Sequence, residues 1–145
     1  MSNSKRKAIL EDIVTQLKSI SSPKIGKVST KPEDFARLAR TAFPFVQVEI
    51  TDETKEDIAI EWRLATMTVD ITVHLDGKSK TEQVQQQLAD IIEVIEEKLE
   101  VDRSRGKQAQ LTELLSVGDI QETGYPTVSQ TMSVGVQYTY IRGNT

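Results

Sequence analysis

Four acidic residues that stand close together are the first candidates for chemistry. Asp52, Glu53, Glu56 and Asp57 lie in one short segment, and a divalent cation uses such carboxylates as ligands. The segment lacks the glycine that the sharp turn of an EF-hand loop requires. A run of this kind is more often a solvated hairpin tip. We therefore treat these residues as candidate surface contacts and not as metal ligands.

The only histidine, His74, is a weak candidate for catalysis. No G-x-S-x-G elbow accompanies it, and a two-histidine metal site is impossible with one histidine. His74 lies between Val73 and Leu75 in an alternating segment, so its side chain is predicted to point away from the core. We expect an ordinary surface residue.

Gly77-Lys78-Ser79 resembles the end of a phosphate-binding loop, because it follows a predicted strand and precedes a predicted helix. The full pattern is G-x-x-x-x-G-K-[ST], and its first glycine would fall at Thr72, inside the strand. Without a glycine-rich arc, the backbone amides cannot wrap a phosphate. We interpret the segment as a polar turn with a helix cap.

The composition of the chain argues against several other kinds of functional site. The 145 residues include no cysteine, which excludes disulfides, thiolate metal sites and cysteine nucleophiles. The net charge of −4 disfavours a protein that grips nucleic acid through its phosphates. From its polar start we expect no signal peptide, and no apolar stretch approaches the roughly 20 residues that span a bilayer. We expect no enzyme activity, no cofactor, no metal, no membrane contact, and synthesis in the cytoplasm.

Helical periodicity predicts two long amphipathic helices, at about 4–20 and about 81–100. Ser79 and Glu82 form a capping box before the second of them. A shorter helix is expected from Thr30 to about residue 42, because Thr30 and Glu33 form another capping box. Residues 24–29 read as a connector.

Alternation with a period of two predicts strands at 45–51, 58–75, 116–122 and 128–141, with residues 52–57 as the turn between the first two. Leu111, Leu114 and Leu115 suggest a short helical turn or an edge segment. The second strand is unusually long, and its apolar residues change from even to odd positions. A bulge or bend is therefore predicted near Ala65–Thr66. This strand either curves around the core or projects beyond the domain.

These elements predict one domain, residues 1–145, of the α+β class. We expect a mostly antiparallel sheet of about four strands with one long bent strand, covered on one face by two main helices and a short helix. Trp62 is predicted to lie in the core, with an interface anchor as the alternative. Arg103, Arg105 and Lys107 form a basic loop, which is a candidate partner for the acidic segment in contacts between subunits.

Several segments together resemble the tail terminator family of tailed bacteriophages, also called minor tail protein U-like or tail completion proteins. The opening helix, residues 5–20, carries Arg6, Ile9, Ile13 and Leu17 in the family's pattern. Residues 43–48, Phe-Pro-Phe-Val-Gln-Val, are similar to its proline-led first strand. The segments 62–75, 81–99 and 131–140 are similar to its long strand, its helix and its terminal strand.

The resemblance implies a structural role in the virion. Such proteins form a ring, usually a hexamer, on the head-proximal end of the tail tube. The ring stops tube polymerisation and offers a docking surface to the neck or connector protein, and DNA passes through its lumen. The implied location is the neck region of the tail, and the family has no catalytic residues to transfer.

Two alternatives remain open at this point. The chain could be another neck or head–tail connector subunit, which would differ in the neighbour that it touches. A different class is a small-ligand binding α+β domain, which requires a deep apolar pocket with a few convergent polar groups. Nucleic-acid binding through the sheet is disfavoured because no aromatic platform is present.

Overall fold

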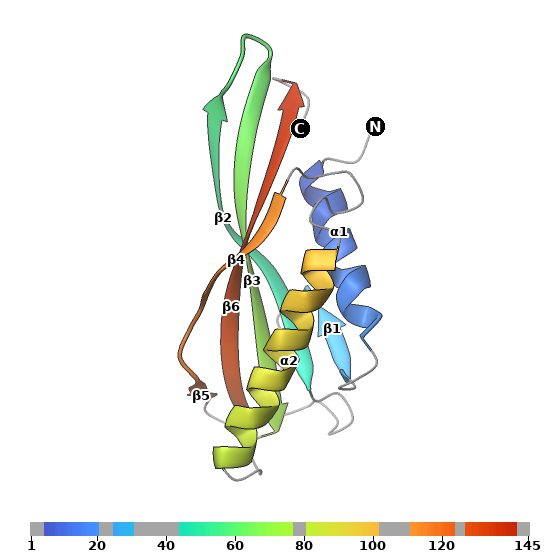
Figure 1. Cartoon of the computed structure of the whole chain (residues 1–145), viewed down its shortest axis with the longest axis vertical. Coiled ribbons are helices and arrows are strands. Elements are labelled where there is room, and N and C mark those ends of the chain that lie inside the picture. Colours follow the sequence, from blue (N-terminus) through green and yellow to red (C-terminus); the bar gives the residue numbers. More distant parts are fainter. Residues whose placement is uncertain are drawn as a thin grey trace.

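The computed structural model describes residues 5–20, 25–30, 44–76, 81–101, 111–123 and 127–141. These residues form two helices and six strands (Figure 1). In chain order the elements are α1 (Lys5–Lys18), β1 (Lys27–Ser29), β2 (Phe45–Asp57), β3 (Trp62–Asp76), α2 (Thr81–Val101), β4 (Leu111–Val117), β5 (Gln121–Thr123) and β6 (Thr127–Ile141).

The strands form one mixed sheet in the order β1-β2-β3-β6-β4, and β5 pairs with β6. Only the β1–β2 pair is parallel, and the other pairs are antiparallel. This confirms the α+β class and the mostly antiparallel sheet. The sheet has six strands and not about four, because the expected connector contains β1 and the expected third strand is divided into β4 and β5. The predicted short helix and the turn at 77–79 fall outside the described residues.

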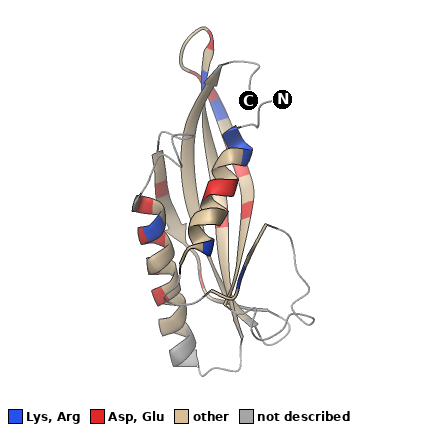
Figure 2. Cartoon of the chain, turned by 90° about the vertical axis from the view of Figure 1, so that its right-hand side faces the viewer, with Lys and Arg blue, Asp and Glu red and all other residues tan. Residues whose placement is uncertain are grey.

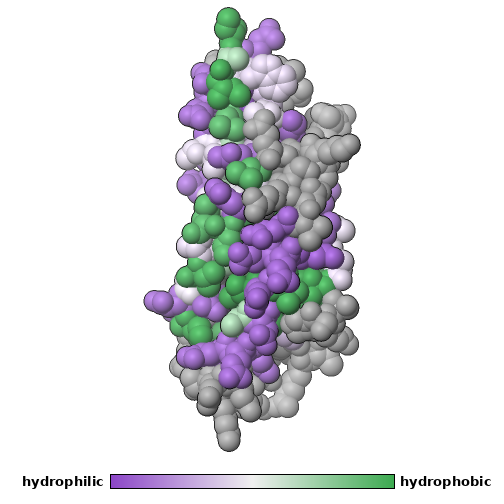
Figure 3. Space-filling model, in the orientation of Figure 1, coloured by the Kyte–Doolittle hydropathy of each residue, from purple (hydrophilic) through white to green (hydrophobic). Residues whose placement is uncertain are grey.

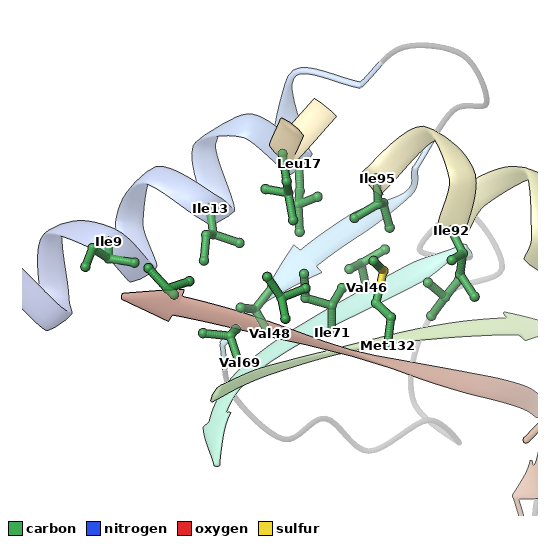
Figure 4. Close-up of a cluster of buried hydrophobic side chains, with 14 of the residues drawn as sticks. Ile9, Ile13, Leu17, Val46, Val48, Val69, Ile71, Ile92, Ile95 and Met132 are labelled. Atoms are coloured by element: carbon green, nitrogen blue, oxygen red, sulfur yellow. The ribbon is translucent and has the colours of Figure 1, made fainter. Parts of the chain in front are cut away.

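The core lies between one face of the sheet and the two helices (Figure 1). Helix α1 contributes Ile9, Ile13 and Leu17, which recur every four residues and are fully buried. Figure 4 shows these side chains facing those of β2, β3 and β6, with Ile92 and Ile95 of α2 beside them. The core thus holds together elements from both ends of the chain, as the helical and strand periodicities predicted.

The strands are longer than the helices that cover them. β3 has 15 residues and is about 50 Å long, whereas the 21 residues of α2 span about 32 Å. One end of the sheet must therefore extend beyond the helical layer. Figure 1 shows the ends of β2, β3 and β6 projecting above both helices. The projecting strand is the second of the two outcomes that the sequence left open.

A bulge in β2 reverses which of its side chains face the helices. Ile50 pairs with Val69, but Asp52 pairs with Thr68, so Thr51 is an extra residue in the ladder. Before the bulge, even-numbered residues of β2 face the helical side. After it, the odd-numbered residues take that side, beginning with Glu53, which pairs with Met67.

The predicted turn and the predicted bulge are both misplaced. Residues 52–57 belong to β2, and the chain turns at 58–61. β3 pairs with β6 without interruption from Trp62 to Asp76, so no bulge occurs near Ala65–Thr66. Four even-numbered apolar residues suggested the change of parity. Ile58 and Ile60 lie in the turn, whereas Trp62 and Leu64 lie in β3 on the face opposite the helices. Alternation is a property of chain spacing, and it does not identify which residues have a partner strand.

The segment after α2 also differs from prediction at its ends. Leu111–Val117 is an extended edge strand, so the alternative of a helical turn is wrong and that of an edge segment is right. Leu115 is the extra residue of a second bulge, between Leu114 and Ser116. Its side chain packs over Gly135, where an added Cβ would lie 3.2 Å from both Leu115 methyl carbons.

The face of the sheet opposite the helices is mainly polar but is buried at one end. Thr72 and Thr131 are joined by a 2.9 Å hydrogen bond, and Ser133 donates one of 2.8 Å to Asp70. Further along, Phe45, His74 and Ser129 form a row across three strands. His74 is only 5% exposed, and its ring centroid lies 5.7 Å from that of Phe45. The prediction of a surface histidine is therefore wrong, because this face is not open to solvent there.

Candidate functional site

The projecting end of the β2–β3 hairpin, residues 52–68, is the most distinctive surface of the described chain, and we refer to it as the distal hairpin. It is not a free two-stranded ribbon, because β6 pairs with β3 as far as Trp62 and Ile141. Three strands thus support it. A surface presented on a three-stranded extension keeps a defined direction relative to the core.

A charged cluster of Arg6, Glu53 and Tyr138 joins the distal hairpin to the start of α1. Arg6 forms a bidentate ion pair with the carboxylate of Glu53, and its Nε lies 3.3 Å from Oε1. The hydroxyl of Tyr138 donates a hydrogen bond to the same carboxylate. The Glu53 side chain is only 13% exposed. The β2 bulge makes this possible, because it turns Glu53 toward the helical side.

The pKa of each group in the charged cluster reflects this arrangement. Burial acts to raise the pKa of Glu53. Hydrogen bonds from Arg6 and Tyr138, together with the charges of Arg6 and Lys55, outweigh this effect, so the pKa of Glu53 is lowered. The hydrogen bond to Glu53 raises the pKa of Arg6. Burial, followed by the bond to Glu53, raises the pKa of Tyr138. At neutral pH the cluster therefore holds an ionised pair and a neutral phenol, which suits a structural latch.

Further contacts order the base of the distal hairpin. Lys5 Nζ donates a 2.5 Å hydrogen bond to the carbonyl of Thr139. Lys55 Nζ lies 5.1 Å from the ring centroid of Tyr140, which is 3% exposed. Across the hairpin, Arg63 Nε lies 3.0 Å from an oxygen of Asp57. At the base of the distal hairpin, charged side chains therefore pack on the sheet where the helices do not reach it.

We expect Lys55→Gln to lower the free energy of unfolding by about 0.5–1 kcal/mol, the usual contribution of a cation over an aromatic ring at an exposed site. Urea denaturation at neutral pH measures the change. Lys55→Arg keeps a cation over Tyr140, so its free energy of unfolding should stay within a few tenths of a kcal/mol of the wild-type value. Equal losses in the two variants would contradict the assignment.

The tip of the distal hairpin, residues 58–62, carries three exposed apolar side chains beside the acid Glu61. Ile58, Ile60 and Trp62 are 54%, 94% and 42% exposed. Hydrogen bonds between Ile58 and Trp62 (3.2 Å) and between Trp62 and Ala59 (3.3 Å) close the turn. Figure 3 shows the apolar surface at this end of the molecule. The prediction that Trp62 lies in the core is therefore wrong, because Trp62 has an even-numbered position in β3 and the side chains at these positions face away from the helices.

The sheet has two edges without a partner strand in the described part of the chain. One is the outer side of β4, where Leu115 and Val117 are 52% and 42% exposed. The other consists of the outer side of β1 and of β2 beyond Gln47, where pairing with β1 ends. Unpaired N–H and C=O groups along such edges can accept a strand from another molecule.

The four acidic residues predicted as surface contacts lie on the distal hairpin but divide between its faces. By register, Asp52 and Glu56 lie on the side opposite the helices, and both are exposed. Glu53 is held in the charged cluster, so it is unavailable for outside contacts. Asp57 is half exposed beside Arg63. The predicted basic residues Arg103, Arg105 and Lys107 lie outside the described residues.

Sequence reasoning missed most of the residues that shape this site. The sequence placed Arg6 only in the pattern of the opening helix, and Tyr138 only within the strand predicted at 128–141. They lie 47 and 85 positions from Glu53, and no local pattern connects them. Ile58 and Ile60 alternate with Trp62 and so read as strand. The charged residues on both sides, Asp57 and Glu61, were the available signal of a turn.

The described residues also bear on other kinds of site. Within the described ranges, no three His, Asp or Glu side chains come close enough together to hold a metal ion. Neither of the helices described here is long and apolar enough to cross a membrane. A surface groove of about 530 Å³ runs along α1, with Leu10, Val14 and Lys18 among its lining residues.

Comparison with known proteins shows that the fold is similar to that of a solved structure. No family model and no curated protein matches this sequence. Among solved structures, a chain from the "Virion of native gene transfer agent (GTA) particle" aligns with a TM-score of 0.56 at 9% sequence identity. The alignment covers 96% of this chain and 100% of that chain. The two chains therefore share one fold over nearly their whole lengths.

Proposed function

We propose that this chain is a structural protein of a phage-type virion. In this proposal it forms a ring, with six subunits as the resemblance implies, at the head-proximal end of the tail tube. There it stops tube polymerisation and presents the docking surface for the neck or connector protein. The observation that carries the proposal is the shared fold with a chain of a gene transfer agent virion, which extends over both chains almost completely.

Two features of the molecule support self-association into a ring. A closed ring requires two different and complementary surfaces on each subunit. The open edges of β4 and β2 lie on opposite sides of the sheet, so they are two distinct surfaces. The distal hairpin adds a third surface, which projects beyond the core and is available to a neighbour (Figure 1).

The charge of the chain suits the proposed role. DNA must pass through the lumen of such a ring without being retained, and a strongly basic lining would bind its phosphates. The net charge of −4 fits a subunit that lets DNA pass. The role needs no catalytic residue and no cofactor, since assembly contacts perform it.

The test is an assay of tube growth. Purified protein added to polymerising tail tube protein should yield shorter tubes with extra density at one end in electron micrographs, and substoichiometric amounts should suffice because each tube has one growing end. The mass of the protein bound to tubes should be a multiple of six subunits. Tubes of unchanged length and unoccupied ends would refute the terminator role.

The same preparation separates the alternatives. A connector subunit would leave tube growth unchanged but bind a neck protein. A small-ligand binding domain would be a monomer or small dimer whose melting temperature rises with its ligand.

A further inference from the structure

The apolar tip of the distal hairpin is exposed within the part of the chain that the structure describes. Ile60 is 94% exposed at the turn, and Ile58 and Trp62 flank it. The tip cannot fold back onto the core, because β2, β3 and β6 are paired up to the turn. A rigid apolar projection of this kind is typical of a segment that another surface receives.

The α1 groove has the properties of such a receiving surface. Its volume is about 530 Å³, and it is lined by six residues of α1 and by Thr30, the residue that follows β1. Leu10 and Val14 are half-buried residues that line it, and the exposed residues Lys7, Glu11 and Lys18 line it as well. Figure 2 shows basic residues at both ends of α1 with acidic residues between them. The groove thus combines an apolar strip with two lysines.

We propose that the tip of one copy seats in the α1 groove of the next copy. The contact rests on the proposed ring and assigns one interface within it. Apolar side chains meet on both sides: Ile58 and Ile60 from the tip, Leu10 and Val14 from the groove. Because tip and groove are different surfaces of one chain, repeating the contact generates a head-to-tail series that can close.

Charge favours this pairing over a contact between two tips. The residues around the turn are three acids and one base, Glu56, Asp57, Glu61 and Arg63, for a sum of −3 + 1 = −2. The charged groove residues are two bases and one acid, Lys7, Lys18 and Glu11, for a sum of +2 − 1 = +1. Opposite signs attract tip to groove, whereas two tips repel one another.

Engineered cysteines test the contact directly, because the chain has none of its own. Copies carrying Ile60→Cys are mixed with copies carrying Thr15→Cys, an exposed position that lines the groove. Mild oxidation should link the two kinds of copy into a disulfide-bonded pair. Copies carrying Glu97→Cys, an exposed position on α2, replace the groove partner as the control and should not be linked.

Association measurements provide a second arm. Ile60→Asp should weaken self-association at least about 30-fold in light scattering, as loss of a central interface anchor does, while Ile60→Leu stays near the wild type. Glu61→Lys and Lys18→Glu should each weaken association, and the double variant should recover it. Circular dichroism confirms that each variant is folded.

The outcomes separate this contact from the ring itself. If wild-type rings form but Ile60→Asp leaves them intact and Ile60→Cys copies link only to one another, the tip–groove contact is wrong and the proposed function stands. If the wild type neither associates nor caps tubes at any concentration tested, both proposals fail.

Discussion

The single histidine resonance of this protein is expected to titrate near pH 4 in the folded state. Burial lowers the pKa of His74 from an ordinary 6.5 to about 4, because the charged imidazolium loses solvation. His74 lies between Phe45 and Ser129 on neighbouring strands, and all three residues are buried. The sequence has no other histidine, so proton NMR reports this group without assignment.

The same shift makes stability depend on pH. In the unfolded chain His74 takes up a proton near pH 6.5, whereas the folded protein resists protonation until about pH 4. Between these values the unfolded state binds more protons, so stability falls as the pH is lowered. The full difference corresponds to about 3 kcal/mol. The loss should begin below pH 6.5 and level off near pH 4.

Urea denaturation of the wild type and of His74→Gln at several pH values between 7 and 4.5 measures this effect. Glutamine does not titrate, so stability of the variant should change much less across this range. A His74 resonance that titrates near 6.5 in the folded protein would contradict the burial of the ring, as would equal pH dependence in the two proteins.

Replacing Glu53 by leucine is expected to lower the free energy of unfolding by about 2–3 kcal/mol. The carboxylate accepts hydrogen bonds from Arg6 and Tyr138, and bonds to charged groups are worth more than neutral ones. The loss leaves the hydroxyl of Tyr138, a residue only 1% exposed, without this acceptor. A buried donor without its partner carries a desolvation cost. Denaturation in urea at neutral pH measures the change.

A double-mutant cycle separates the charged cluster from general effects of substitution. Tyr138→Phe alone should cost about 1–2 kcal/mol, but in the Glu53→Leu background it should cost little or recover stability, because it removes the buried hydroxyl that has already lost its acceptor. Glu56→Leu, an exposed position on the same strand, is the matched control and should change stability by less than about 0.5 kcal/mol. Strictly additive effects at Glu53 and Tyr138 would refute the cluster.

The acid response of the charged cluster differs from that of His74. The folded pKa of Glu53 lies below its ordinary value of 4.5, so its contribution is present above about 4.5 and is lost as the pH falls through the folded pKa. The free energy of unfolding of Glu53→Gln should therefore depend less on pH than that of the wild type, and only below about pH 4.5. His74 changes stability between pH 6.5 and pH 4. The variants His74→Gln and Glu53→Gln therefore assign each part of the pH dependence of stability to one group.

Local periodicity determined the regular elements of this fold. The helical spacing at 4–20 predicted α1, and the alternation at 128–141 predicted β6. The residues that recur with these periods, Ile9, Ile13 and Leu17 in α1 and Met132 to Tyr140 at even positions in β6, are the buried ones. These predictions hold because a helix and a strand place side chains at fixed angles along the chain. The α+β class followed from the order of the elements.

Tertiary structure decided which residues of those elements are covered. Ile58, Ile60 and Trp62 alternate as core residues do, yet they are exposed. Ile58 and Ile60 lie in the turn beyond the helices, and Trp62 faces away from the helices. His74 occupies an outward position, yet it is buried beside Phe45. Glu53 faces Arg6 and Tyr138 only because one extra residue in β2 reverses the faces of the strand. Spacing along the chain specifies the direction of a side chain, whereas burial and pairing depend on which distant segment lies opposite it.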